Sequence, residues 1–311
     1  MRSWVAGLLG FAAALLLAAC TVWVSPPDSP SPTPAPSEAS TPPSSAPAPV
    51  VLAAGDIAAC DSNGDEVAAT LLDDLGGTIL TLGDNAYPDG TTADFANCYD
   101  PSWGRHRTRT YPSAGNHEYQ TADAAPYFAY FGAAAGEPGQ GWYSFDLGAW
   151  HLIALNSNCE EVGGCDPASP QAEWLRADLA AHPATCTLAY WHHPRWSSGD
   201  GHGSDSRTDG FWRILFDAGA DLVLTAHDHE YERFVAMDAD GAVDPNGIVE
   251  FVVGTGGRSL YEFGDILPTS AARDNSTYGV LRLTLRADGY EWEFVGVSDT
   301  GFTDAGSAGC R

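Results

Sequence analysis

The feature that most constrains this fold is a short apolar run followed directly by a side chain that can bind a metal. The pattern occurs in VVLAAGD, TILTLGD, TLAYWHH and DLVLTAHDH, which contain Asp56, Asp84, His192, His227 and His229. Apolar runs of this length are typical of buried parallel strands. Ligands collect outside the carboxyl ends of such strands, so we expect these side chains to meet in one crevice of an α/β fold.

Five short segments supply seven candidate metal ligands. Carboxylate and phenolate oxygens suit a trivalent iron, whereas an Asn carbonyl and neutral imidazoles suit divalent zinc, manganese or iron. A single Asp or His is more often a helix cap, a turn residue or a core hydrogen-bond partner, but the whole set outweighs that interpretation. The predicted ligands are Asp56, Asp84, Tyr87, Asn116, His192, His227 and His229.

These motifs resemble the calcineurin-like metallophosphoesterases and, within them, the purple acid phosphatases. The wider family pattern is D-x-H, G-D, G-N-H-[DE], a lone His and G-H-x-H. The purple subgroup lacks the first of these histidines and has G-D-x-x-Y. Here Ala58 replaces the histidine and Tyr87 stands three residues after Asp84, a paired departure specific to the subgroup. The resemblance covers residues 50 to 300 and departs at Ala226, where the family has Gly.

The resemblance implies a fold and a role for each ligand. The implied fold is α/β, a four-layer αββα sandwich of two mixed β-sheets flanked by helices. A shared carboxylate places two metals about 3.5–4 Å apart, which suits an in-line displacement at phosphorus. The implied ligands are Asp56, Tyr87 and His229 for Fe(III), Asn116, His192 and His227 for a divalent Fe, Zn or Mn ion, and Asp84 as the bridge.

Two further histidines are candidate catalytic groups. His117 follows the Asn ligand, where the family uses a His to contact phosphate or to protonate the leaving oxygen, and an imidazole can do either. His202 lies in the Gly-rich segment SSGDGHGSDS and is a second candidate for the acid, with a mobile surface loop as the competing interpretation. His193 adjoins His192, so we expect it to face away from the metals, as a support or as packing.

The predicted reaction is phosphomonoester hydrolysis by a metal-bound hydroxide, because bound metals lower the pKa of water. A protonated imidazole then assists the departure of the alcohol. A phosphodiesterase or nucleotidase on the same metals is the alternative, since that choice depends on loops such as 88–110 and 195–210. A surface binding protein with a degenerate site is a third interpretation, which the intact ligand set opposes.

The charge of the chain limits the classes of partner that it can bind. A net charge of −27, with 14 basic residues that are all arginine, argues against a nucleic-acid partner, since phosphate contacts need Lys and Arg. An acidic protein that handles anionic phosphoesters needs metal ions, which are the largest local charges in such a site. The expected partner is therefore a small phosphorylated substrate.

The N-terminus predicts export and attachment to a membrane. Arg2 precedes the apolar residues 5–19, and the segment LAAC at 17–20 resembles a bacterial lipobox. We therefore expect a signal peptide over 1–19 and a lipid anchor on Cys20. An ordinary signal peptide with an incidental Cys, or a membrane anchor, stays open, although the run is short for a span of about 20 residues.

A Pro-rich segment follows the predicted leader. Residues 25–49 consist mainly of Pro, Ser, Thr and Ala, so we expect a disordered tether over 20–49. The catalytic domain is then expected over 50–311, outside the cytoplasm at the cell membrane. The tether leaves no room for the N-terminal β-domain of the large plant enzymes, so the resemblance is to the small, single-domain kind.

The cysteines predict a disulfide framework. Six remain after Cys20, and an even number in an exported chain favours disulfides. The sequence permits many pairings, and cysteine-ligated zinc is disfavoured because no C-x-x-C spacing occurs. The pairs that we expect are Cys60–Cys98, Cys159–Cys165 and Cys186–Cys310.

Hydrophobic periodicity predicts the main elements. A β-α-β opening predicts that the first sheet begins parallel, and WYSFDLG with WHLIALNS predicts a hairpin that turns at Gly148-Ala149. Ser169 and Pro170 are the expected N-cap and first residue of a helix. We expect helices at 65–75, 169–182 and 209–219, and further strands at 50–55, 78–82, 187–191, 221–226, 248–254, 278–286 and 290–297.

Overall fold

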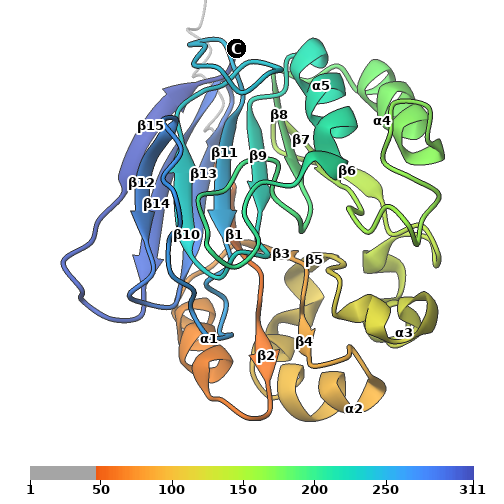
Figure 1. Ribbon diagram of the computed structural model, residues 1–311, viewed down its shortest axis with the longest axis vertical. Helices are drawn as coiled ribbons and strands as arrows, with labels where there is room; N and C mark the ends of the chain where they lie inside the picture. The colour runs from red at the N-terminus through yellow and green to blue at the C-terminus, as the bar shows by residue number, and fades with distance from the viewer. Residues whose placement is uncertain (1–46) are drawn as a thin grey trace, which may run out of the picture. The chain divides into compact units, whose positions relative to one another are not determined.

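The computed structural model describes residues 47–311, which contain two large mixed β-sheets (Figure 1). The predicted signal peptide, Cys20 and nearly all of the predicted tether lie outside the described residues. Among the described residues, no helix has the length and apolar character that crossing a membrane requires.

The first sheet has six strands and contains the parallel β-α-β opening that the sequence predicts. β1 pairs in parallel with β3, and β3 with β5. On the other side of β1, the strands β13, β14 and β15 follow one another in antiparallel pairs. In spatial order the strands are β15 (Ala305–Gly309), β14 (Gly289–Gly296), β13 (Gly279–Arg286), β1 (Val50–Ala54), β3 (Thr78–Leu82) and β5 (Thr110–Ser113).

The second sheet has seven strands and includes the expected hairpin, β6 with β7. Its centre, from β7 through β8 and β9 to β11, is parallel. In spatial order the strands are β12 (Ser270–Asp274), β10 (Tyr231–Phe234), β11 (Val249–Val253), β9 (Leu222–Thr225), β8 (Cys186–Tyr190), β7 (Trp150–Ala154) and β6 (Tyr143–Leu147). A short parallel pair, β2 (Ala58–Ala59) and β4 (Ala86–Tyr87), lies apart from both sheets.

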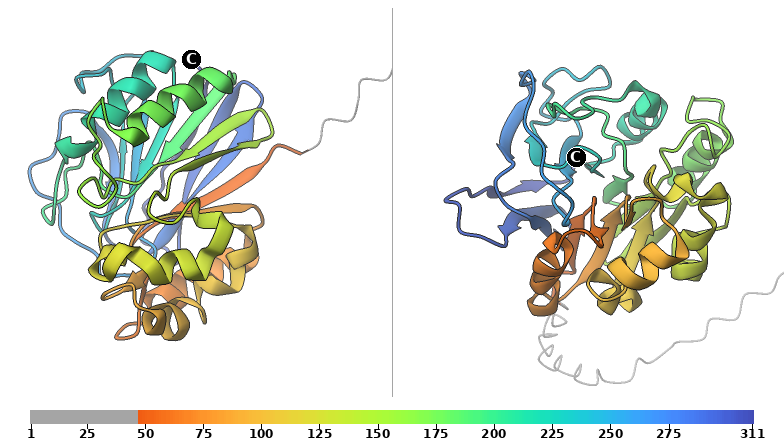
Figure 2. Two further views of the ribbon diagram at one scale, coloured as in Figure 1. Left: turned by 90° about the vertical axis from the view of Figure 1, so that its right-hand side faces the viewer. Right: turned by 60° about the horizontal axis from the view of Figure 1, so that its bottom comes forward.

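Helices cover the outer faces of the sheets (Figures 1 and 2). α4 and α5 bury Leu175, Phe211 and Leu215 in one apolar cluster with Ile153 and Val223 of the second sheet. The helices are α1 (Gly64–Asp74), α2 (Thr92–Asp94), α3 (Ala125–Phe131), α4 (Pro170–Ala181) and α5 (Asp209–Ala218). Two mixed sheets flanked by helices confirm the expected fold class.

Local signals account for the helix boundaries. The Ser169 hydroxyl accepts a hydrogen bond from the Ala172 N–H, and Pro170 is the first residue of α4, as expected. α1 ends at Asp74 because Gly77, at φ 125°, takes the chain into β3.

The three expected disulfides are also present, namely Cys60–Cys98, Cys159–Cys165 and Cys186–Cys310. The last links the start of β8 to the segment after β15, and so ties the C-terminus to the second sheet.

Candidate metal centre

The predicted ligands lie where strands of both sheets end. Asp56, Asp84 and Asn116 follow the carboxyl ends of β1, β3 and β5, which are parallel neighbours in the first sheet. His192 and His227 follow β8 and β9, which are parallel neighbours in the second sheet. The carboxyl edges of the two parallel segments therefore deliver ligands from both sheets to one place.

Three ligands have a strained backbone. Asp56, Asp84 and His227 have φ values of 57°, 48° and 72°, in the left-handed region that L residues rarely adopt. Such strain is concentrated at functional sites. A hydrogen bond of 2.8 Å from the His227 N–H to Asp56 Oδ2 holds two of these turns together across the sheets.

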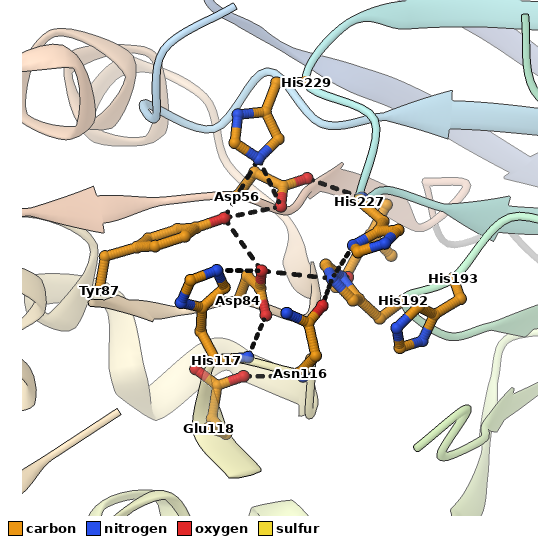
Figure 3. Close-up of polar contacts among 12 residues, drawn as sticks. Asp56, Asp84, Tyr87, Asn116, His117, Glu118, His192, His193, His227 and His229 are labelled. Carbon is orange, nitrogen blue, oxygen red and sulfur yellow. Dashed lines mark hydrogen bonds and ion pairs between the residues drawn. The ribbon is translucent and has the colours of Figure 1, made fainter. Parts of the chain in front are cut away.

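Asp56, Tyr87 and His229 form one group of donor atoms, which we name the tyrosine cluster (Figure 3). The Tyr87 hydroxyl lies 2.9 Å from Asp56 Oδ1 and 3.3 Å from His229 Nε2. His229 Nε2 is in turn 3.3 Å from Asp56 Oδ1. These separations match the edges of a coordination shell whose metal–ligand bonds are about 2.0–2.2 Å.

Asn116, His192 and His227 form a second group, the asparagine cluster (Figure 3). His192 Nε2 lies 3.1 Å from Asn116 Oδ1 and 3.0 Å from His227 Nδ1. Asp84 joins the two clusters, because its Oδ2 is 3.0 Å from the Tyr87 hydroxyl and 3.3 Å from His192 Nε2. The structure therefore brings all seven predicted ligands together and places Asp84 between the two sets.

The hydrogen bonds of the histidines show that this donor set fits cations. His192 Nδ1 is 2.8 Å from the Leu82 carbonyl, and His229 Nδ1 is 2.6 Å from the Ser259 carbonyl. A carbonyl can only accept, so both Nδ1 atoms carry the proton, and in the neutral rings both Nε2 atoms are lone pairs. Those lone pairs face other acceptors, including Asp84, and a cation resolves that conflict.

The pKa values reflect the same crowding of acceptors. Burial lowers the pKa of His192, but the charges of Asp84 and Asp56 outweigh it and raise this pKa to about 9. Burial and the charge of His192 lower the pKa of His227, so that ring is neutral. Cations that displace the proton from His192 bind more tightly as the pH rises.

His117, a predicted catalytic residue, lies beside the predicted ligands. Its Nδ1 donates a hydrogen bond to the Pro88 carbonyl, which leaves Nε2 facing Asp84 Oδ2 at 3.7 Å. Its backbone N–H donates to Asp84 Oδ1 at 2.9 Å, so that Oδ2 of this carboxylate faces the two clusters. The His117 ring packs against Tyr87 with 4.3 Å between ring centroids.

His202 and His193 flank His227. The exposed His202 ring stacks on the His227 ring with 3.8 Å between centroids. The buried His193 ring lies 4.4 Å from the same ring, and its Nδ1 is 2.8 Å from the Ser157 hydroxyl. The structure therefore brings His202 to the centre. His193 does not face away from the centre as expected, because its ring lies beside those of His192 and His227.

Glu118 supports the turns of the candidate site, and sequence reasoning gave it no role. It is fully buried, and its carboxylate accepts backbone N–H groups from Asn85 at 2.8 Å and Gly115 at 2.7 Å. These bonds tie the turn after β3 to the turn after β5, and so hold Asp84 beside Asn116. The sequence signal that could have pointed to Glu118 is the acidic last position of the G-N-H-[DE] motif.

Ala226 stands where the family motif has Gly, and the structure accommodates its methyl group. A Cβ atom at Gly55 would lie 2.6 Å from the Ala226 Cβ atom. The methyl therefore fills the space above a glycine in the facing turn, and no ligand is displaced.

Residues 49–231, more than half of the chain, match the model of the calcineurin-like phosphoesterase family. The chain belongs to this family. Purple acid phosphatase 15 of Arabidopsis thaliana is 30% identical over 216 residues, which cover 58% of this chain and 40% of that relative. The match thus spans well under half of this relative's length.

Solved structures show the same fold. A purple acid phosphatase, PPD1 from seeds of yellow lupin (Lupinus luteus), superposes with a TM-score of 0.72 at 18% identity, over 85% of this chain and 54% of that one. GAP50, described as the anchor in the inner membrane complex of Plasmodium, superposes with a TM-score of 0.65 at 15% identity, over 86% and 90%. The same fold thus occurs in a phosphatase and in a protein described as an anchor, so the function of this chain has to be inferred from its site.

Proposed function

We propose that this chain is a dinuclear phosphatase that hydrolyses small phosphomonoesters. The observation that carries the proposal is the position of Asp84, whose Oδ2 lies within 3.0 Å of Tyr87 and 3.3 Å of His192 and so belongs to both clusters. Two bound cations would neutralise the phosphate group and lower the pKa of water at the site.

The proposed metals follow from the donor atoms. Burial and the charges of Asp56 and Asp84 hold the pKa of Tyr87 well above its usual range. Only a strongly acidic cation displaces such a proton, and a phenolate suits trivalent iron, which we assign to the tyrosine cluster. The asparagine cluster offers an amide oxygen and two imidazoles, which suit divalent iron, zinc or manganese.

The proposed roles of the chain's own groups follow from their positions. Asp84, Asn116 and their partners would orient the phosphate group through the cations. His117 presents Nε2 to the centre from a ring that Pro88 holds in place. His202 lies over His227, at the rim of the asparagine cluster. We assign contact with the phosphate to His117 and protonation of the leaving alcohol to His202.

The test is phosphate release from p-nitrophenyl phosphate, measured together with metal content. Asp84→Ala should abolish hydrolysis and lose metal, because both clusters lose their shared ligand. His117→Ala should keep its metals and lose about 10²–10⁴ in rate. His182→Ala, whose half-exposed side chain bonds only within its own helix, is the control.

Three outcomes would contradict this proposal. Full activity of Asp84→Ala would place the site elsewhere. Metal loss in His117→Ala as large as in Asp84→Ala would make His117 a ligand. Faster cleavage of bis(p-nitrophenyl) phosphate than of the monoester would make the protein a phosphodiesterase.

We also propose that the protein acts outside the cytoplasm, anchored to the cell membrane through a lipid on Cys20. The support is the segment LAAC at residues 17–20 after an apolar run. Cys20→Ala should release the protein from the membrane fraction or leave it unprocessed. A variant that fractionates and migrates like the wild type would contradict the anchor.

A further inference from the structure

One carboxylate between two predicted metal ligands anchors a whole loop. Asp228, which is fully buried, follows His227 and precedes His229. Its Oδ2 accepts hydrogen bonds from the Ser197 hydroxyl at 2.5 Å and the Gly203 N–H at 2.9 Å, and its Oδ1 accepts one from the His202 N–H at 2.8 Å. Three donors of the segment 197–203 thus converge on one side chain.

The loop is shaped around this carboxylate. The Gly199 N–H donates to the Ser197 hydroxyl at 3.0 Å, and that hydroxyl in turn donates to Asp228. A Cβ atom at Gly199 would lie 2.4 Å from Asp228 Cγ, closer than any side chain allows. The glycine therefore lets the backbone of the loop lie directly on the carboxylate.

The anchored loop carries His202 to the metal centre. The anchored N–H belongs to His202 itself, and its ring stacks on His227 at 3.8 Å and 21°. His202 is exposed, and among the described residues its ring makes no hydrogen bond. The stacking contact and the backbone anchor therefore set where the imidazole lies relative to the asparagine cluster.

We propose that Asp228 is a positioning residue that holds the loop 197–203, and with it the His202 imidazole, over His227 at the edge of the metal centre. This inference rests on the proposed function in one respect, the role of His202 as proton donor. In that step water forms the new bond to phosphorus, the ester P–O bond breaks, and one proton passes from the His202 imidazolium to the leaving oxygen.

Amide hydrogen exchange tests the anchor without reference to activity. Both carboxylate oxygens of Asp228 accept bonds from the loop, so the amide group in Asp228→Asn can satisfy only one side. We expect exchange at His202 and Gly203 to become at least about tenfold faster, while the metal content is unchanged. Asp221→Asn is the matched control, since Asp221 is also buried and accepts two backbone N–H bonds, but at the opposite end of its strand.

The dependence of rate on the leaving group tests the role in catalysis. An alkoxide leaves poorly without a proton, whereas 2,4-dinitrophenolate needs none. Asp228→Asn and His202→Ala should each lower kcat for an alkyl phosphate about 10²-fold and change kcat for 2,4-dinitrophenyl phosphate by less than about threefold. The double variant should be no slower than His202→Ala, because both changes remove the same function.

Several results would overturn the inference. Unchanged exchange at residues 202 and 203 in Asp228→Asn would show that the carboxylate does not hold the loop. Metal loss in that variant would show that it supports the ligands instead. Wild-type leaving-group dependence in Asp228→Asn, or in His202→Ala, would remove the catalytic role. If Asp228→Asn does not fold, Gly199→Ala, which pushes the loop off the carboxylate, takes its place.

Failure of the proposed function gives a different result. A wild-type protein that binds two metals but cleaves no phosphomonoester would contradict the proposed reaction. The exchange rates at residues 202 and 203 would still decide whether Asp228 anchors the loop.

Discussion

At the scale of single residues, the proposed centre depends on an exchange of one predicted ligand for another. Ala58 takes the position of a histidine ligand of the wider family, and Tyr87 brings a hydroxyl to 2.9 Å from Asp56 and 3.0 Å from Asp84. The Tyr87 side chain is almost fully buried, and as a phenol it donates to these two carboxylates. As a phenolate it would become one more anionic oxygen at the same place, which favours a hard trivalent ion.

This exchange predicts a colour. Iron-loaded, oxidised protein should absorb visible light through charge transfer from the Tyr87 phenolate to iron. Tyr87→Phe should bleach the band and keep the fold, because only a hydroxyl is lost. Tyr261→Phe is the control, since the Tyr261 ring stacks on His229 at 3.9 Å, but among the described residues its hydroxyl makes no hydrogen bond to a predicted ligand. An active, iron-replete, oxidised wild type with no visible band would assign two divalent metals instead.

At the scale of elements, the turns that follow the strands shape the centre as much as the predicted ligands do. Gly83, at φ 86°, lies between β3 and Asp84. A Cβ atom there would lie 2.6 Å from His192 Nδ1, the atom that donates to the Leu82 carbonyl. The absence of a side chain at position 83 therefore lets a ligand of the second sheet lie against a turn of the first.

Gly83→Ala should consequently displace His192 and empty the asparagine cluster first. We expect the metal content to fall from two ions to one per chain, with the visible band of the tyrosine cluster retained. Gly76→Ala is the matched control, because a Cβ atom there has no neighbour within 4 Å. Full metal content in Gly83→Ala would show that the turn accommodates a side chain at position 83.

The strength of the apolar pattern in each strand explains which strands could be predicted from the sequence. Among the strands that lead to predicted ligands, β5 before Asn116 was missed, because TYPS is not an apolar run. Strands β1, β3, β8 and β9 were predictable, because apolar runs such as TILTL end next to Asp84 and its counterparts. The edge strands β12 and β15 were not, because SAARD and AGSAG lack an apolar face and are strands only through pairing with β10 and β14. Helices α2 and α3 and strands β2, β4 and β10 were also missed.

Some features of the site could likewise be predicted from the sequence, and others could not. Motif spacing predicted seven ligands, and the structure brings all seven side chains together. The bonds of Asp228 to the loop 197–203 were not predictable, because they depend on the course of a Gly-rich loop that has no periodicity. The support that Glu118 gives to two turns depends likewise on where those turns meet.

At the scale of the whole molecule, an ionic cluster of buried His151, buried Asp178 and exposed Asp146 lies at the amino-terminal end of β7, away from the metal centre. The His151 ring donates to Asp146 at 2.8 Å and to Asp178 at 2.8 Å. Burial lowers the pKa of His151, but the bonds to the two carboxylates outweigh it and raise the pKa. The folded protein therefore holds a proton on this ring that the unfolded chain releases near pH 6.5.

The sign of the pH dependence follows from that raised pKa. The stability from His151 is complete below about pH 6.5 and is lost as the pH rises through the higher folded pKa. His151→Gln should lower the free energy of unfolding by about 3 kcal/mol at pH 5.5 and by less at pH 9, measured by urea unfolding. His182→Gln, at a half-exposed partner of Asp178, should cost less than about 1 kcal/mol. An equal loss for His151→Gln at both pH values would contradict the charged cluster.

The central claim is that one carboxylate, Asp84, serves two metal ions that are otherwise held by separate clusters. Metal analysis of the purified chain, reconstituted with iron and zinc, beside that of Asp84→Ala tests it most directly. The account predicts two ions per wild-type chain and at most one, weakly held, in Asp84→Ala. A wild type that holds fewer than two ions, or an Asp84→Ala protein that retains both, would contradict it.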